Sequence, residues 1–339
     1  MTMYSSNKAL INTLNDALYN GQPEQFSNLL NDTLSQDASV HICFPFETLQ
    51  GPQEYYTKAF EPLFSAIPDL EKRTYILMAN EANGDEWVGA GGYYTGTFEQ
   101  PWLDIPPTGK QVSMRFHEFY RVRDGKVVEV QALWDIPELM IQAQSWPLSP
   151  SLGREWHVPA PATQDGLMFG DTNQSLTQET FHVVNNMLHG LLKHAEGGAK
   201  AMGLESYWHP HCSWYGPSTI GTARGIQGFR KHHQIPFLNA MPDRTTIWEN
   251  GVLFAENNYV AFTAWPGMSM TLSGDGWLGI APNDKEITMR SLDFWRCEGP
   301  LIRENWVLVD ILDVYNQLGV DVFARMRELN QSRFGHYFQ

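Results

Sequence analysis

Two stretches of the chain place apolar side chains at helical spacing. Apolar residues recur at intervals of three or four within residues 7–19, and the same spacing returns within residues 178–194. Each stretch is followed by a second helical segment and then by a helix that begins at Gly51 in one case and at Gly225 in the other. The pattern therefore predicts two successive sets of helices.

After each set of helices the pattern changes to one typical of strands. Residues 73–98 and 244–267 each predict a pair of strands, and two more strands follow in each case. The tetrapeptides NGDE and RDGK are turn signals between neighbouring strands. Helices followed by antiparallel strands predict an α+β fold in which a curved, mostly antiparallel sheet wraps round helices.

One unusual segment occurs twice. Residues 102–115 are WLDIPPTGKQVSMR and residues 277–290 are WLGIAPNDKEITMR. The match continues downstream with a constant offset between the two copies. Upstream the offset differs by one residue, as a single-residue insertion in a loop would cause. The chain is therefore an internal duplication.

The duplication predicts the domain boundaries. We expect a first domain at 1–142, a proline-rich linker at 143–175, a second domain at 176–330 and a C-terminal tail at 331–339. Prolines disfavour helix interiors and central strands, which is why the segment between the copies is assigned as a linker. Two copies in one chain also predict an intramolecular pseudo-dimer with a pseudo-twofold axis between packed sheets.

Composition narrows the class of partner. The formal net charge of -15 argues against a nucleic acid or an anionic membrane surface as partner, because both repel an acidic protein. Three widely spaced cysteines and the lack of a signal peptide or apolar span predict a cytoplasmic protein with reduced thiols. Since GAGGYYTG lies within predicted strands, it is not a phosphate-binding loop, and we expect no cofactor.

The repeated motifs resemble those of the SnoaL-like polyketide cyclase family within the nuclear-transport-factor-two-like superfamily. The resemblance rests on IPPTGK at 105–110, DGK at 124–126 and the WD at 134–135, and on NQLG at 316–319 in the second copy. It implies two tandem cone-shaped α+β-barrel domains. It also implies that an acid/base aspartate lies on the last strand, which Asp135 and Asp310 match.

Both aspartates have alternative explanations. Asp135 lies three residues before Glu138, and Asp310 lies three residues before Asp313, which is the spacing of a helix N-cap and an acidic N3 residue. A buried arginine such as Arg290 could pair with the aspartate and lower its pKa, which would make it a structural brace. Many relatives have a histidine five residues before the aspartate, whereas this chain has Val130 and Asn305 there.

The second copy concentrates residues suited to binding a flat or apolar small molecule. The candidate substrate-binding residues are Tyr207, Trp214, Tyr215, Trp248, Trp265, Arg290, Asp293, Trp295 and Trp306, with Asp135 from the first copy. His209 and His211 would share one face of a strand, which suggests metal ligation, but no third ligand follows from the sequence and we predict no metal. Any of the tryptophans could alternatively be core.

Two functions remain open at this stage. The first is an enzyme that abstracts a proton beside the carbonyl of an apolar, polyketide- or steroid-like molecule. In it Asp310 is the base, Asn305 or Tyr215 is the donor, and His209 or His211 assists. The second is a noncatalytic module that binds a small molecule and in which the duplication replaces a homodimer. A filled cavity in the second copy would exclude the first hypothesis.

Overall fold

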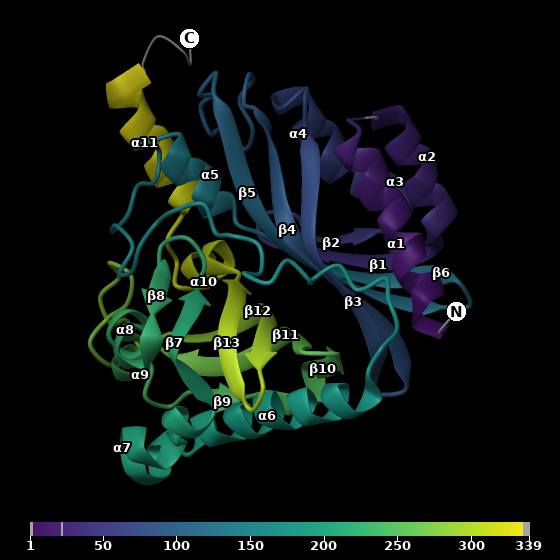
Figure 1. Cartoon of the computed structure of the whole chain (residues 1–339). Helices are drawn as coiled ribbons and strands as arrows, with labels where there is room; N and C mark the ends of the chain where they lie inside the picture. The colour runs from purple at the N-terminus through teal and green to yellow at the C-terminus, as the bar shows by residue number, and fades with distance from the viewer. Residues whose placement is uncertain (1–2, 22, 335–339) are drawn as a thin grey trace.

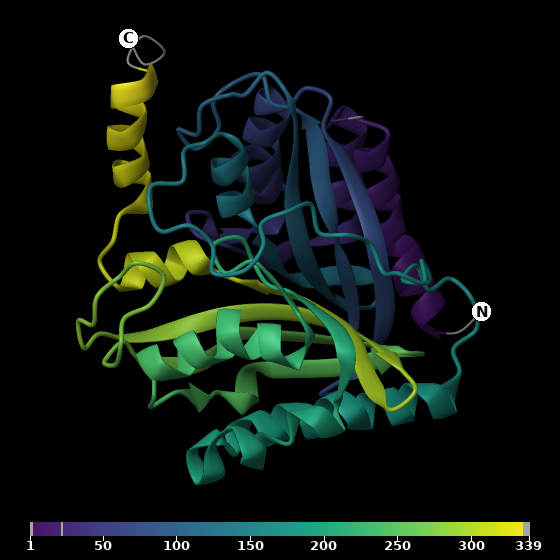
Figure 2. The ribbon, with the colours of Figure 1, turned by 60° about the vertical axis from the view of Figure 1, so that its left-hand side comes forward.

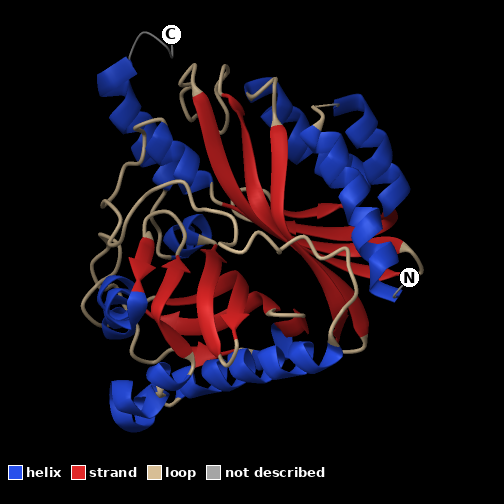
Figure 3. Cartoon of the chain, viewed as in Figure 1, coloured by secondary structure: helices blue, strands red, loops and turns tan. Residues whose placement is uncertain are grey.

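The computed structural model describes residues 3–21 and 23–334 and folds them into two copies of one α+β arrangement (Figure 1). Each copy has one mixed sheet with helices against one of its faces (Figure 3). The predicted duplication and α+β class are confirmed. Each sheet is open and does not close into a barrel, because a different strand forms each of its two edges.

The first copy contains a six-stranded sheet of order β2-β1-β6-β5-β4-β3. Strands β1 and β6 are parallel, and every other described pairing in this sheet is antiparallel. Its helices are α1 Met3–Tyr19, α2 Pro23–Thr33, α3 Gly51–Tyr55, the π-helix Tyr56–Phe60, α4 Glu61–Ala66 and α5 Ile136–Gln142. Its strands are β1 Leu34–Ile42, β2 Glu47–Gln50, β3 Glu71–Ala82, β4 Asp85–Thr97, β5 Gln111–Arg123 and β6 Lys126–Trp134.

The second copy repeats this topology as β10-β11-β12-β13-β7-β8, with the short β9 paired to β11. Its helical segments are α6 Gln174–Leu192, α7 His194–Met202, the 3-10 turn Leu204–Ser206, α8 Gly225–Phe229, the π-helix Arg230–Gln234, α9 Ile235–Ala240, the 3-10 turn Trp248–Asn250, α10 Ile311–Gln317 and α11 Val322–Phe334. Its strands are β7 Trp208–Tyr215, β8 Thr222–Arg224, β9 Thr245–Thr246, β10 Gly251–Glu256, β11 Tyr259–Thr271, β12 Glu286–Glu298 and β13 Leu301–Val309.

The repeated segment has the same local structure in both copies. Trp102 forms an isolated β-bridge with Ile105, and Trp277 forms the equivalent bridge with Ile280. The backbone N–H of the tryptophan donates to the backbone carbonyl of the isoleucine at 3.3 Å in the first copy and at 2.9 Å in the second. The recurring tryptophan and isoleucine therefore close the same small loop twice.

The segment between the copies lies on the surface of both. Arg154 bridges to Thr222 of β8, and Leu167 bridges to Leu77 of β3. Helix α6 begins two residues before the predicted start of the second domain, and α11 runs four residues past its predicted end at 330. Residues 335–339 of the predicted tail lie outside the described residues. No helix in the described part of the chain is long and apolar enough to cross a bilayer.

The two sheets pack against each other through the faces that their own helices leave uncovered. Helices α1 and α2 cover the far side of the first sheet, and α6 covers the far side of the second (Figure 2). Phe119 of β5 and Phe294 of β12, which occupy matching positions in the repeat, stack with ring centroids 5.2 Å apart. The predicted pseudo-twofold relation between the sheets is thus centred on one aromatic pair.

Glycines on β4 make room for this pair. A Cβ added at Gly89 would lie 3.0 Å from Cε1 of Phe294, and one at Gly91 would lie 3.2 Å from Cε2 of the same ring. His117 completes the contact, because its Nδ1 lies 2.7 Å from the carbonyl oxygen of Leu292. Burial lowers the pKa of His117 to about 3, so this imidazole is neutral and donates through Nδ1–H.

The last strand of each copy is followed directly by an aspartate that binds the other copy. Oδ2 of Asp135 accepts a hydrogen bond from the backbone N–H of Ser218 at 2.9 Å, and Oδ2 of Asp310 accepts one from Phe44 at 2.9 Å. The two partners match in the repeat, so the contact obeys the pseudo-twofold symmetry. Lys8 of α1 adds a buried ion pair to Glu256 at the end of β10.

We predict that the aromatic pair and its glycines are energetically coupled. Phe294→Ala should lower the free energy of unfolding by about 3–5 kcal/mol, since it leaves a cavity between two packed sheets. Gly89→Ala should cost about 1–3 kcal/mol in the wild-type background by overpacking the ring, and much less in the Phe294→Ala background. Urea unfolding followed by tryptophan fluorescence measures all four proteins.

The matched control is Phe169→Ala, because Phe169 is 52% exposed and outside the interface. We expect it to change the unfolding free energy by less than about 0.5 kcal/mol. Equal costs of Gly89→Ala in both backgrounds would show that the glycine has a role unrelated to Phe294.

Candidate functional site

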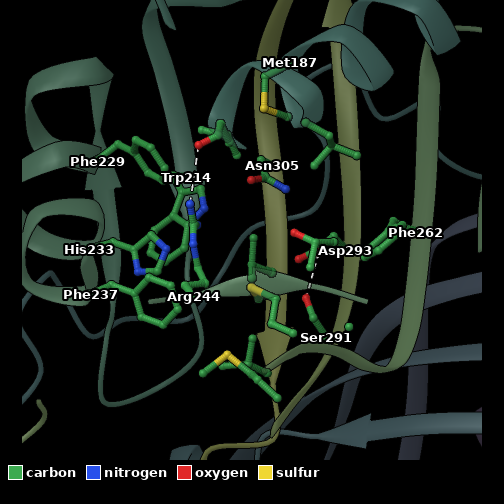
Figure 4. A pocket seen from close by; sticks show the side chains of 18 of the residues that line it. Met187, Trp214, Phe229, His233, Phe237, Arg244, Phe262, Ser291, Asp293 and Asn305 are labelled. Carbon is green, nitrogen blue, oxygen red and sulfur yellow. Dashed lines mark hydrogen bonds between the residues drawn. The ribbon is translucent and has the colours of Figure 1, made fainter. Parts of the chain in front are cut away.

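A cavity of about 170 Å³ lies inside the second copy, between its sheet and α6, α8 and α9 (Figure 4). Most of its lining is apolar or aromatic, with Met187, Leu191, Phe229, Phe237 and Trp277 among the residues that contribute. Cavities of this composition with a few polar groups are typical of small-molecule sites.

Asp293 is the carboxylate of this cavity. It lies on β12 and alternates with Phe294, so its side chain points inward while the phenylalanine points to the other copy. The hydroxyl of Ser291 donates to Oδ2 at 2.8 Å, whereas Oδ1 is buried and has no partner among the described residues. Burial raises the pKa of Asp293 to about 8, and the hydrogen bond from Ser291 opposes this shift.

The first copy has a glutamate at the matching position, and there the carboxylate is fully partnered. Glu118 accepts hydrogen bonds from four side chains at 2.5–3.0 Å, which are Lys72, Tyr94, Tyr120 and Trp134. Burial by itself would raise the pKa of Glu118, but Lys72 and the hydrogen bonds outweigh burial and the pKa is lowered. Glu118 is therefore held as an ion inside a filled core.

Smaller side chains in the second copy open the space that the first copy fills. The strand registers identify the equivalent positions in the two copies. The pair Lys72 and Tyr94 of the first copy corresponds to Thr246 and Met268 of the second. The pair Phe116 and Trp134 corresponds to Ser291 and Val309. Each of the four positions is larger in the first copy, and all four in the second copy line the cavity. The cavity thus results from large-to-small replacements around a retained carboxylate.

The cavity wall presents hydrogen-bond donors. The indole N–H groups of Trp208, Trp277 and Trp295 are buried and have no acceptor among the described residues. Trp295 lies two residues from Asp293 on β12, so the two side chains share a face at a Cα spacing of about 6.6 Å. A tryptophan with an unpartnered indole N–H therefore lies close to the carboxylate on the same face of β12.

One side of the cavity is an aromatic stack with a cation beside it. The imidazole of His233 stacks on Trp214 with centroids 4.3 Å apart, and Phe237 lies on its other side at 5.5 Å. Figure 4 shows Arg244 running along this stack, with Asp293 across the cavity from it. Burial and then the charge of Arg244 lower the pKa of His233 to about 3, so this imidazole is neutral.

Five of the residues predicted from the sequence meet in this cavity: Trp214, Trp248, Asp293, Trp295 and Asn305. Asn305 differs from its expected role as a donor. Its amide nitrogen donates to the backbone carbonyls of Phe294 at 3.0 Å and Trp306 at 3.4 Å, so its N–H groups are engaged.

Asp310, the predicted base, lies outside the cavity lining at the boundary between the copies. Its Oδ1 accepts from the N–H of Asp313 at 3.2 Å, which is the N-cap hydrogen bond that its sequence position suggested. Its Oδ2 lies 3.1 Å from Nη1 of Arg290. Burial raises the pKa of Asp310 to about 7 in spite of this arginine, so the expectation that the pair lowers it was wrong.

Asp135 occupies the equivalent boundary position in the first copy but does not cap α5 with its side chain. Its Oδ2 lies 3.2 Å from Nη2 of Arg115 and also accepts from Ser218. The capping interpretation is therefore wrong for Asp135, because the arginine and the opposite copy use its carboxylate. Arg290 and Trp265 also lie at this boundary, where the guanidinium lies 4.9 Å from the indole centroid.

The remaining predicted residues are outside the cavity. His209 and His211 share one face of β7 as expected, but that face is at the surface, and Nδ1 of His209 accepts from the N–H of His211 at 3.0 Å. Tyr207 is half-buried at the start of β7. Tyr215 donates to Glu304 at 3.1 Å, and Trp306 donates to the carbonyl of Pro159 at 3.0 Å. No cluster of three metal-ligating side chains exists among the described residues.

Sequence reasoning missed Ser291 and Arg244, and it assigned no role to His233. A signal was present in the internal alignment, because Ser291 replaces Phe116 and Arg244 replaces Leu70 at inward-facing positions. Comparing residue sizes between the copies would have marked the cavity.

Three solved structures are each similar to about two fifths of this chain. AclR from Streptomyces galilaeus is 24% identical and matches 40% of this chain and 94% of its own, with a TM-score of 0.34. IdmH from Streptomyces antibioticus is 20% identical over 40% of this chain and 96% of its own, with a TM-score of 0.34. TsrD from Streptomyces laurentii is 19% identical over 42% and 98%, with a TM-score of 0.35.

No curated protein matches the chain. The model of the SnoaL-like polyketide cyclase family matches residues 9–143 and again residues 196–318, which together are well over half of the sequence. Both copies match the family model, in agreement with the same strand order in their two sheets. The chain therefore belongs to the SnoaL-like polyketide cyclase family, of which it contains two tandem copies.

Proposed function

We propose that the cavity of the second copy is the active site of a small-molecule enzyme in which Asp293 transfers a proton to and from the carbon beside a carbonyl. The observation that carries this proposal is the environment of Asp293, a buried carboxylate with one unpartnered oxygen facing an apolar cavity. Membership of a polyketide cyclase family supports a reaction of the cyclase or isomerase type.

The proposed step begins with a carbonyl oxygen near the indole N–H of Trp295. Oδ1 of the ionised Asp293 removes a proton from the adjacent carbon, and the electron pair of the C–H bond forms an enolate whose oxygen accepts the indole hydrogen bond. The protonated Asp293 then returns the proton to the same or another carbon, so the step needs no oxidant or co-reactant. A carboxyl pKa of about 8 suits both directions of this transfer near neutral pH.

The size of the cavity limits the substrate. A volume of about 170 Å³ is close to that of engineered cavities that bind benzene, and below the roughly 300–1,000 Å³ of sites for drug-sized ligands. The proposed substrate is therefore a compound with about one ring and short substituents. A steroid-sized molecule would require the wall to move.

Binding without catalysis is the second candidate function, and one observation favours it. With a pKa of about 8, Asp293 is mostly protonated at pH 7 and could donate a hydrogen bond to a retained ligand. The two functions differ in whether carbon-bound hydrogen exchanges with solvent.

The first test is hydrogen exchange of a ketone. In deuterated water, wild-type protein should catalyse exchange of the α-hydrogens of 1-indanone, and Asp293→Asn should slow the catalysed rate by about 100-fold or more, since an amide cannot accept the proton. Proton NMR measures the rate, and the melting temperature reports on folding.

Asp310→Asn is the matched control, because Asp310 is as buried as Asp293 but lies outside the cavity. Its exchange rate should stay within about threefold of wild type. An unchanged rate in Asp293→Asn would remove this residue from the mechanism, and loss of the rate in Asp310→Asn alone would restore the role first predicted for it.

The second prediction concerns pH. Because the base acts in its ionised form, the exchange rate should rise with pH and level off above about 8. Ser291→Ala removes a hydrogen bond that lowers the pKa of Asp293, so the rise should move upward by roughly 0.5–1 pH unit. A profile that does not move in this variant would mean that another group controls the rate.

The third prediction concerns stability. The folded protein keeps a proton on Asp293 up to pH about 8, whereas an unfolded aspartate loses it near 3.9, so the wild type loses stability as the pH rises between these values. Asp293→Asn avoids this loss. Its unfolding free energy should exceed that of wild type by roughly 1–4 kcal/mol at pH 9 and differ little at pH 4, as urea unfolding would show. Equal differences at both pH values would contradict a raised pKa.

A further inference from the structure

Arg244 differs from most of the buried or half-buried arginines that the structure describes; Arg230 also lacks an ion pair, but it donates to Gln234 and does not line the cavity. Arg115, Arg290 and Arg296 each pair with a carboxylate, at 3.2, 2.6 and 2.6 Å respectively. Arg244 lines the cavity and forms no ion pair with the side chains that the structure describes. Its one described hydrogen bond is from Nη2 to the carbonyl oxygen of Leu191 at 3.4 Å. Most of its five N–H donors therefore have no acceptor among the described residues.

Nearby aromatic rings do not replace the missing anion. The guanidinium carbon lies 5.8 Å from the ring centroid of Phe237, near the outer limit of a cation–π contact. Burial lowers the pKa of Arg244, yet an arginine stays charged in a protein. Arg244 is half-buried, and a charge that is partly removed from water without a counter-ion raises the free energy of the unliganded protein.

The repeat shows that the position itself does not require a cation. The match of AIPD at 66–69 with AMPD at 240–243 aligns Arg244 with Leu70, which is completely buried in the first copy. An apolar side chain therefore suits this position where the core is filled. The cation occurs in the copy that contains the cavity.

Most of the unpartnered polar groups of the wall are donors. The indole N–H groups of Trp208, Trp277 and Trp295 are donors, as are those of Arg244. Oδ1 of Asp293 and Nδ1 of His233 are the other unpartnered side-chain atoms among the described lining residues. A wall rich in donors matches a ligand rich in oxygen acceptors.

We infer that the substrate carries a carboxylate that binds Arg244, at the opposite side of the cavity from the carbonyl group that Asp293 addresses. This inference rests on the proposed function for the location of the carbonyl but not for the presence of the anion. The ligand class is a single-ring aromatic or enone acid with a ketone, whose ring lies along the stack of Trp214 and His233. Arg244 is then the residue that determines specificity for acids over neutral analogues.

The arrangement also explains how an acidic protein could bind an anion. The net charge of -15 repels anions at long range, but salt screens that field beyond about 8–10 Å. Inside the cavity the charge that matters is the nearest one. Arg244 is that charge, because it is the one lysine or arginine among the described residues that line the cavity.

The test compares two probes of nearly the same shape, 4-acetylbenzoate and its neutral amide, 4-acetylbenzamide. Isothermal titration calorimetry at pH 7 should show that wild-type protein binds the acid at least about tenfold more tightly than the amide. Arg244→Gln should remove this preference by weakening the acid alone, and Arg244→Lys should keep part of it because the charge remains.

Lys231→Gln is the matched control, because it removes one exposed cation from a neighbouring segment and leaves the cavity intact. It should keep the full preference for the acid. Retained affinity for the amide shows that Arg244→Gln is folded. Equal binding of acid and amide by wild type, a preference that survives in Arg244→Gln, or no binding of either probe at about 10 mM would overturn the inference.

A further variant separates this inference from the proposed function. Asp293→Asn should keep the preference for the acid, because Arg244 provides it, while losing exchange of the acetyl hydrogens. If wild type prefers the acid but exchanges no hydrogen, the anion site stands and the proposed catalysis falls. If exchange occurs without any preference for the acid, the catalysis stands and the anion site falls.

Discussion

The packing of one sheet face on the other is the constraint on which the rest of this molecule depends. Phe119 and Phe294 stack where the copies meet, and alternation along their strands then fixes that the next residues, Glu118 and Asp293, point into the two interiors. A shift of one residue in either strand would turn the interface side chains into the interior and the interior side chains into the interface. The location of the carboxylate is thus a consequence of how the copies pack, and the same packing takes Asp135 and Asp310 out of the interiors to serve as contacts between the copies.

The two interiors show alternative solutions for one buried carboxylate. In the first copy it is surrounded by an ammonium group and three neutral donors, which makes it an ion in a filled core. In the second copy most of those partners are gone, the pKa of the carboxyl is raised and a cavity lies in front of it. The difference is a small set of side-chain sizes, because the backbone arrangement is shared. The first copy has a filled core, and the second copy contains the cavity that we propose as the active site.

The sequence allowed the duplication, the α+β class, both hairpin turns and the order of helices and strands to be predicted, because these depend on local periodicity and on self-similarity. Four of the residues that it grouped as substrate-binding candidates line one cavity, namely Trp214, Trp248, Trp295 and Asp293. It named Asp310 as the base and Asp293 as a substrate-binding residue, because the resemblance points to the aspartate at the last strand. Only the packing of the copies shows that Asp293 on β12 faces the cavity and that Asp310, directly after β13, lies at the boundary between the copies. His209 and His211 share a strand face as predicted, but which face is buried depends on the sheets and not on the alternation.

The glycine hollow that receives Phe294 exists on one side of the axis only. Gly89 and Gly91 have Ala261 and Thr263 as their counterparts in the strand registers, and the Thr263 hydroxyl donates to Gln131 of the other copy. A true dimer of the first half would therefore have a hollow on both sides of its twofold axis. A true dimer of the second half would have a hollow on neither side. The two halves of the chain have therefore acquired different, complementary surfaces, and each half fits the other half better than it would fit a second copy of itself.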